Sequence, residues 1–201
     1  MTKDAFLKRV RDALHRHPGQ PAQEPPPLLA PLADWDAAEL ADLFAAELTL
    51  VGGHVHRVAD LAEAKGCLRE LVAAFGAKSF LRSADGVVDE VIEDLGIPQA
   101  DHPGDADVGI TGARYGIAAT GTLVLTSEAG RRDSLLPMHH VALLNVAQLV
   151  PTVAEALESH YRAMPSAWVQ ATGPSRTADI ELTLTTGVHG PGVVHVILIG
   201  S

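Results

Sequence analysis

The apolar positions of residues 33–201 follow two different spacings along the chain. Stretches in which they recur every three or four residues predict helices, and short apolar runs between turn residues predict strands. The predicted helices are residues 36–50, 60–75, 87–95 and 151–163. The predicted strands are residues 54–58, 78–81, 108–111, 116–126, 139–146, 168–172 and 193–199. This alternation predicts an α/β fold in three layers, with an open, largely parallel sheet and helices on both faces.

Residues 1–32 differ in pattern from the rest. Residues 3–16 have a helical apolar stripe, and residues 1–17 contain five basic and two acidic side chains. Residues 18–31 hold six of the thirteen prolines, which favours a stiff, extended arm. We therefore divide the chain into a helix with a proline-rich arm (1–32) and an α/β domain (33–201). The helix docks either on a partner protein or on its own domain or a symmetry mate.

Composition and charge exclude several classes of protein. The 201 residues contain one cysteine, Cys67, which excludes a disulfide scaffold and an iron–sulfur cluster held by this chain alone. The net charge is −10, and residues 34–107 carry sixteen of the 25 acids, which argues against a nucleic-acid partner. Since no apolar run is long enough to span a membrane and no secretion signal is present, we expect a cytoplasmic protein.

The histidine pairs give little support for a metal site. His54 and His56 share one face of a predicted strand and could ligate a metal, but a solvated strand face is the simpler interpretation. His139 and His140 are adjacent, so on a strand they point to opposite faces and cannot bind the same ion. We predict no metal in this chain.

Three segments combine small residues with hydroxyl groups and charge: residues 117–122 (IAATGT), 172–181 (TGPSRTADIE) and 187–192 (GVHGPG). In the second, Pro174 follows a strand and predicts a helix that runs to about residue 184. The first turn of a helix binds anions, and open α/β sheets place ligands at the carboxyl ends of strands. The alternative is an ordinary helix cap in which Arg176 pairs with an acid of this chain.

These segments supply the candidate site residues. The predicted ligand-binding residues are Thr120, Gly121, Thr122, Gly173, Ser175, Arg176, Thr177, Gly187 and Gly190. The candidates for a catalytic group are His189, Glu181 and Asp179. We expect Arg176 to bind a carboxylate or phosphate. His189 acts either as an acid or base or as a donor that fixes its loop.

Two further segments are residues 109–127 (GITGARYGIAATGTLVLTS) and 131–144 (RRDSLLPMHHVALL). Together with the three segments above, they resemble the LUD-domain family, specifically its LutC type of lactate utilisation protein. The resemblance runs from about residue 33 to residue 199. It implies a fold similar to the CoA-transferase and sugar-phosphate-isomerase group. It also implies a bacterial, cytoplasmic role in oxidising L-lactate to pyruvate beside iron–sulfur partner proteins, which would hold the clusters.

One position departs from the family pattern, since Ala119 stands where relatives commonly have an acidic residue. We expect a LutC-like subunit that binds a small anionic or phosphorylated molecule in a cleft. A second hypothesis is a non-catalytic assembly subunit for the iron–sulfur partners, and a homo-oligomer is a further option. A sugar-phosphate isomerase or CoA-transferase-like enzyme is a weaker alternative, because it rests on fold analogy alone.

Overall fold

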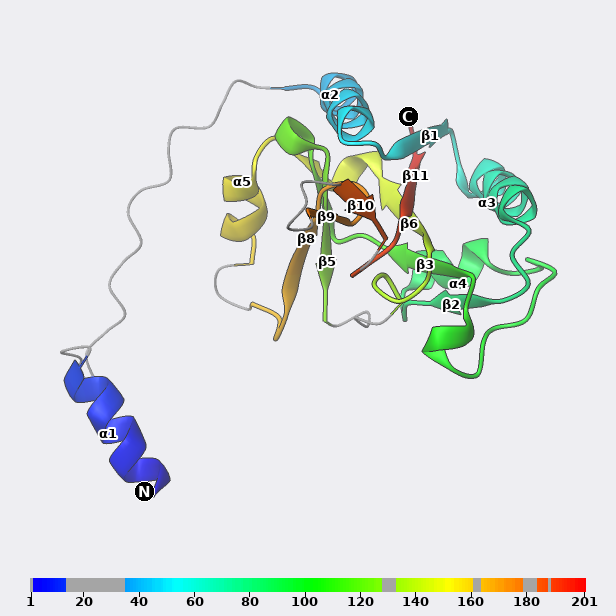
Figure 1. The fold of residues 1–201 in the computed structure, drawn as a ribbon. Coiled ribbons are helices and arrows are strands. Elements are labelled where there is room, and N and C mark those ends of the chain that lie inside the picture. The colour runs from blue at the N-terminus through cyan, green and yellow to red at the C-terminus, as the bar shows by residue number, and fades with distance from the viewer. Residues whose placement is uncertain (1, 14–34, 128–132, 161–163, 179–183, 188) are drawn as a thin grey trace. The chain divides into compact units, whose positions relative to one another are not determined.

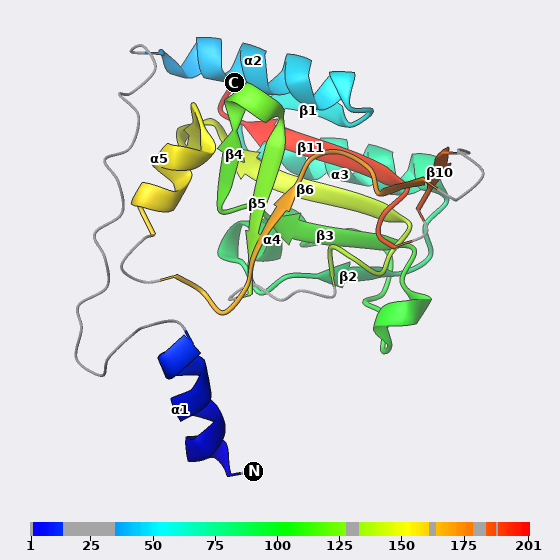
Figure 2. The same cartoon turned by 60° about the vertical axis from the view of Figure 1, so that its left-hand side comes forward.

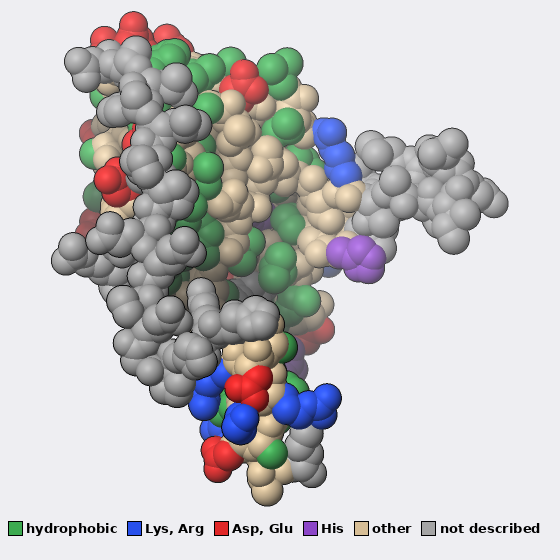
Figure 3. Space-filling model, turned by 90° about the vertical axis from the view of Figure 1, so that its left-hand side faces the viewer, with side chains coloured by type: hydrophobic (Ala, Val, Ile, Leu, Met, Phe, Trp, Pro, Cys, Tyr) green, Lys and Arg blue, Asp and Glu red, His purple; other side chains and the backbone are tan. Residues whose placement is uncertain are grey.

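The computed structural model describes residues 2–13, 35–127, 133–160, 164–178, 184–187 and 189–201. The chain divides into two compact units, Met1–Pro31 and Leu32–Ser201. Helix α1 (Lys3–Ala13) belongs to the first unit and has no buried residue. Its surface carries both basic and acidic side chains, as Figure 3 shows. None of the helices in the described part of the chain is long and apolar enough to cross a membrane.

A parallel sheet of five strands forms the centre of the second unit, in the order β1-β11-β6-β3-β2 (Figures 1 and 2). Its strands are β1 (His54–Val58), β2 (Phe80–Arg82), β3 (Val108–Gly112), β6 (His139–Asn145) and β11 (Val193–Ile199). All five correspond to predicted strands, and every pair in the sheet is parallel. The predicted α/β class and largely parallel sheet are therefore confirmed.

Two helices, α3 (Leu61–Phe75) and α4 (Gly86–Val91), cover one face of this sheet (Figure 2). The Asp60 carboxylate caps the start of α3 by accepting two backbone amides, and Gly76 ends it at φ +64°. Both ends of α3 lie where the sequence predicts them. The buried apolar cluster between these helices and the sheet includes Val58, Leu68, Val72, Val88, Ile110, Val141, Leu143 and Ile197.

Helix α2 (Ala37–Leu50) and a second sheet cover the opposite face (Figure 2). This sheet has four strands in the order β7-β4-β5-β8. They are β4 (Tyr115–Ile117), β5 (Thr122–Thr126), β7 (Leu149–Val150) and β8 (Trp168–Ala171). The prediction of helices on both faces is thus incomplete, because antiparallel strands take up much of this face. The cluster here includes Phe44, Leu48, Leu123, Ala142, Leu144, Val194, Val196 and Leu198.

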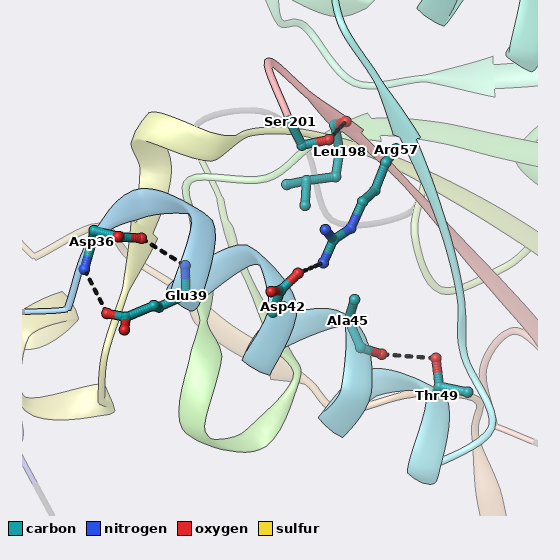
Figure 4. A network of polar contacts seen from close by, with 8 residues as sticks. All are labelled: Asp36, Glu39, Asp42, Ala45, Thr49, Arg57, Leu198 and Ser201. Atoms are coloured by element: carbon teal, nitrogen blue, oxygen red, sulfur yellow. Dashed lines mark hydrogen bonds and ion pairs between the residues drawn. The ribbon is translucent and has the colours of Figure 1, made fainter.

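Polar contacts fix the start and the middle of α2 (Figure 4). The Asp36 side chain accepts the Glu39 amide at 2.8 Å, and the Glu39 carboxylate accepts the Asp36 amide at 3.1 Å, which completes a capping box. In the middle of the helix, Asp42 pairs with Arg57 of β1 at 2.7 Å. The first pair of contacts caps the helix, and the ion pair ties it to an edge strand of the parallel sheet.

The segment predicted as one strand over residues 116–126 is a hairpin. Strand β4 leads through a short 3-10 helix, η2 (Ala118–Thr120), and a left-handed Gly121 at φ +57° into the antiparallel β5. A Cβ atom on Gly121 would lie 2.2 Å from the Leu48 nitrogen, so the turn packs directly on the α2 backbone. The single strand was wrong because the glycine turns the chain there.

The helix predicted after Pro174 is also absent from the described residues. Strand β9 (Arg176–Ala178) pairs antiparallel with β10 (Leu184–Thr186), so Thr177 faces Thr185 across the ladder. The remaining elements are helix α5 (Val153–Glu158) and the 3-10 helices η1 (Pro103–Asp105) and η3 (Val146–Gln148).

Candidate functional site

Threonine hydroxyls connect the first two predicted segments. The Thr122 hydroxyl oxygen lies 2.7 Å from that of Thr120 and 2.7 Å from that of Thr172. Thr122 is buried, and these bonds tie the start of β5 to the residue that follows β8. The structure therefore places Thr120, Gly121 and Thr122 together at the corner of the hairpin, where they contact α2 and the second segment.

Backbone hydrogen bonds connect the second and third segments. The Ser175 amide donates to the Pro191 carbonyl at 2.9 Å, and the Gly187 amide donates to the Ser175 carbonyl at 3.0 Å. Gly190 lies against the same serine, since a Cβ atom there would be 3.2 Å from the Ser175 Cβ. The predicted helix start is therefore wrong, because no helix begins at Pro174 in the described residues and the Ser175 amide already has a partner; anion binding by these residues stays a prediction.

A cavity of about 330 Å³ lies beside these two segments. Five predicted site residues line it: Gly173, Ser175, Arg176, His189 and Gly190. The other walls come from β5, β8, the residues before β6, and the starts of β6 and β11. Arginine and histidine side chains line the cavity, and no acidic side chain is among the described residues that form it. Although the whole chain carries a net charge of −10, this lining favours an anionic ligand.

Arg176 contributes both to this cavity and to the end of α2. Its Nη2 donates to the carbonyl oxygen of Val51, the residue that caps the carboxyl end of the helix. A cation at this end is favourable because the helix dipole places negative partial charge there. Gly52 lies directly beneath the guanidinium, since a Cβ atom there would be 2.8 Å from Nη2. Arginine has five N–H donors, so this contact leaves others for a ligand.

His140 is a cavity residue that the sequence-based site missed. It is 2% exposed, and its Nε2 lies 2.8 Å from the hydroxyl oxygen of Thr111. Burial lowers the pKa of His140 to about 4, so the imidazole is neutral near pH 7. The signal in the sequence was its position, since this histidine directly precedes the apolar run of residues 141–144. It was missed because adjacent residues of a strand point to opposite faces, which excluded His139 and His140 as a metal pair and left His140 without a predicted role.

The remaining predicted residues either lie beside the cavity or fall outside the described residues. Gly187 has φ +78° and lies against Met138, since a Cβ atom there would be 3.2 Å from the Met138 sulfur. Thr177 lies in β9, so its backbone belongs to the hairpin. Asp179 and Glu181 lie outside the described residues. The structure therefore brings part of the predicted set to the cavity and places Thr177 and Gly187 in the backbone framework beside it.

His54 is exposed, as a solvated strand face predicts, whereas His56 is half-buried and contacts a histidine of the neighbouring strand. Nε2 of His56 lies 2.8 Å from Nδ1 of His195 on the neighbouring β11, and the His54 ring stacks on His195 at 4.6 Å. Burial, followed by the adjacent histidines, lowers the pKa of His195 to about 4. Within the described ranges, no three His, Cys, Asp or Glu side chains are placed to hold a metal ion.

The fold defines an α/β protein with a cavity beside a glycine-rich segment. Residues 100–199, which contain every predicted site residue, match the LUD domain model. The chain is 30% identical over 215 residues to the lactate utilization protein C of Anoxybacillus flavithermus, covering 94% of both chains. It is 40% identical over 126 residues to that of Halalkalibacterium halodurans, covering 58% of this chain and 54% of the relative.

A solved structure has the same architecture. The crystal structure of a DUF162 family protein from Deinococcus radiodurans superposes with a TM-score of 0.61 at 25% identity, covering 83% of this chain and all of that one. Together with the full-length similarity above, these matches identify the chain's family. The chain belongs to the LUD-domain family and is of its lactate utilisation protein C type.

Proposed function

We propose that this chain is a LutC-like subunit of a bacterial cytoplasmic system that oxidises L-lactate to pyruvate, and that its cavity binds a small carboxylate. The observation that carries this proposal is the 330 Å³ cavity, which Arg176 lines and to which the described residues contribute no acid. The names of the relatives from Anoxybacillus and Halalkalibacterium support lactate as the substrate class.

The groups around the cavity suit a short 2-hydroxy or 2-oxo acid. The guanidinium of Arg176 can donate two parallel hydrogen bonds to a carboxylate. The neutral imidazole of His140 can accept a bond from a hydroxyl group or donate one to a keto oxygen, depending on its tautomer. Apolar side chains of Val169 and Val194 complete the walls and suit a methyl group.

The electron acceptors belong to partner proteins in this proposal. An iron–sulfur cluster needs several thiolates or histidines at its irons, and this chain has a single cysteine. Cys67 packs against the apolar cluster under α3, and burial raises the pKa of its thiol. These residues do not fit a cluster, so the chain's own contribution would be to bind and orient the acid.

The first test is a ligand panel on the full chain, followed by thermal unfolding. L-lactate, pyruvate, sugar phosphates and nucleotides are added separately. A ligand at about 100 times its dissociation constant should add roughly 2.7 kcal/mol to the free energy of unfolding. We expect stabilisation by lactate or pyruvate; a chain that responds to neither acid would contradict the proposal.

The second test replaces the arginine. A hydrogen bond to a charged group contributes on the order of 1.5–3 kcal/mol, so Arg176→Ala should weaken carboxylate binding by roughly 10- to 150-fold. Arg57→Ala is the matched control, because it also removes an arginine that contacts α2 but does not line the cavity. Unchanged affinity in a folded Arg176→Ala protein would remove this side chain from the site.

One observation favours the assembly role as a second candidate. Helix α1 has no buried residue and exposes Phe6 and Val10, which lie on its apolar stripe. We therefore also test a deletion of residues 1–31 for binding to iron–sulfur partners. Loss of the complex with intact carboxylate binding supports an assembly role for this segment, and the opposite result supports the cavity as the functional site.

A further inference from the structure

A second cavity lies at the other end of the parallel sheet, where the strands finish. It has two adjacent lobes of about 230 Å³ and 140 Å³, which share the lining residues Asp85, Gly112, Ala113 and Gln148. These residues follow β2, end or follow β3, and follow β6. Open α/β sheets place ligands outside the carboxyl ends of their strands. None of the predicted site residues contributes to this lining.

The larger lobe is polar. Arg114 and Thr126 line it together with the shared residues. The Arg114 guanidinium carbon lies 6.0 Å from the centroid of the Tyr115 ring, and the described residues give this arginine no ion pair. It is therefore the group in this lobe that suits a phosphate or carboxylate.

The smaller lobe is apolar. Leu61, Val87, Leu143 and Ile199 line it, together with Asn145 and the shared residues. Three of these residues lie on one face of the parallel sheet, since Leu143 and Ile199 of the strands and Leu61 of α3 belong to the same apolar cluster. Such a lobe suits a flat or aliphatic group rather than a charged one.

The junction of the lobes is held in place by local contacts. Oδ1 of Asp85 accepts the Val87 amide at 3.0 Å, while Oδ2 has no hydrogen-bond partner among the described residues. A Cβ atom on Gly112 would lie 2.4 Å from Oδ2, so only glycine leaves room for this carboxylate. The Gln148 amide nitrogen donates to the Ala113 carbonyl at 2.9 Å, and its oxygen accepts the Asn145 amide at 2.8 Å.

We propose that this cavity binds a nucleoside monophosphate. The groups along the cavity match the three parts of this molecule in order. The apolar lobe holds the base, Oδ2 of Asp85 accepts hydrogen bonds from the ribose hydroxyls, and Arg114 binds the phosphate. A nucleoside triphosphate suits it less well, because a single arginine faces the polar lobe and the sequence lacks the lysine of a phosphate-binding loop. This site is independent of the carboxylate cavity.

The test is calorimetric titration of the full chain with AMP, adenosine and ribose 5-phosphate. We expect AMP to bind more tightly than either fragment. Arg114→Ala should weaken AMP binding at least tenfold and leave adenosine unchanged. Asp85→Asn keeps an oxygen for the helix cap but loses the charge, so it should weaken both AMP and adenosine at least tenfold.

Two controls locate the binding. Arg69→Ala removes an exposed arginine of α3 that lines neither cavity, and Arg176→Ala alters the other cavity; both should leave AMP affinity unchanged. Absence of AMP binding, or AMP binding that survives the Arg114 and Asp85 substitutions in proteins with unchanged unfolding midpoints, would overturn the proposal. AMP binding that falls only in Arg176→Ala would also overturn it, by moving the nucleotide to the carboxylate cavity.

Discussion

At the scale of single residues, His140 links the sheet to the candidate site. It belongs to β6, on the face that packs against α2 and the second sheet, and it lines the carboxylate cavity. Its Nε2 contacts Thr111 of the adjacent strand at 2.8 Å. Because burial keeps the ring neutral, it can serve as a hydrogen-bond acceptor or donor without repelling or attracting a carboxylate as an ion would.

The low pKa of His140 predicts a pH dependence of stability. An unfolded histidine titrates near 6.5, whereas the folded group titrates at about 4, so the unfolded state binds more protons between these values. The free energy of unfolding should therefore fall as pH drops from about 6.5 to about 4, by roughly 1.4 kcal/mol per pH unit for this one group. Urea denaturation at a series of pH values measures this slope.

The matched variant is His140→Gln, which keeps a polar partner for Thr111 but does not titrate. Between pH 6 and pH 5, its free energy of unfolding should change less with pH than that of the unmodified chain. The difference should correspond to about one proton, or roughly 1.4 kcal/mol per pH unit. His195 titrates over the same range and is unchanged in this variant, so part of the slope should remain. Equal slopes in the two proteins would show that His140 is not buried as described.

At the scale of elements, local signals predicted the long helices and central strands well. Asp60 and Gly76 bound α3 as the sequence indicates, and the apolar run of β11 lies between two parallel neighbours. The second sheet was not predicted, because β4 and β7 are only three and two residues long and show no period. Such strands are defined by their partners rather than by their own sequence.

The same reasoning explains the errors at the site. Pro174 and the residues after it have the local pattern of a helix start, but the Ser175 backbone bonds to Pro191 and Gly187 instead. These partners lie more than ten residues away, beyond the reach of a local pattern. Predicted residues such as Arg176 and His189 nevertheless line the cavity, whereas His140 was missed because the contact that marks it comes from another strand.

The Gly121 turn gives a test of the hairpin. Gly121→Ala would place a methyl group 2.2 Å from the Leu48 nitrogen at φ +57°, so we expect a loss of about 1–3 kcal/mol or more in the free energy of unfolding. Gly66→Ala is the control, since Gly66 lies in α3 with open space around it and should gain about 1 kcal/mol. Equal effects of the two substitutions would contradict the packing of this turn on α2.

At the scale of the whole molecule, the two units differ in charge and in burial. The first seventeen residues are basic, whereas residues 34–107 are strongly acidic. Because no residue of α1 is buried, removing residues 1–31 should leave the unfolding midpoint of residues 32–201 unchanged within about 2 °C. Circular dichroism during heating measures this, and a large drop would show that the first unit contributes to the core of the second.

The most direct test of the central claim is to locate bound L-lactate by amide chemical shifts. The isotope-labelled full chain is titrated with lactate, and the perturbed backbone amides are assigned. We predict that the largest changes fall on Ser175, Arg176, His189 and Gly190, which line the carboxylate cavity. Saturable changes centred instead on Gly112, Arg114 and Gln148, or no changes at all, would contradict the account.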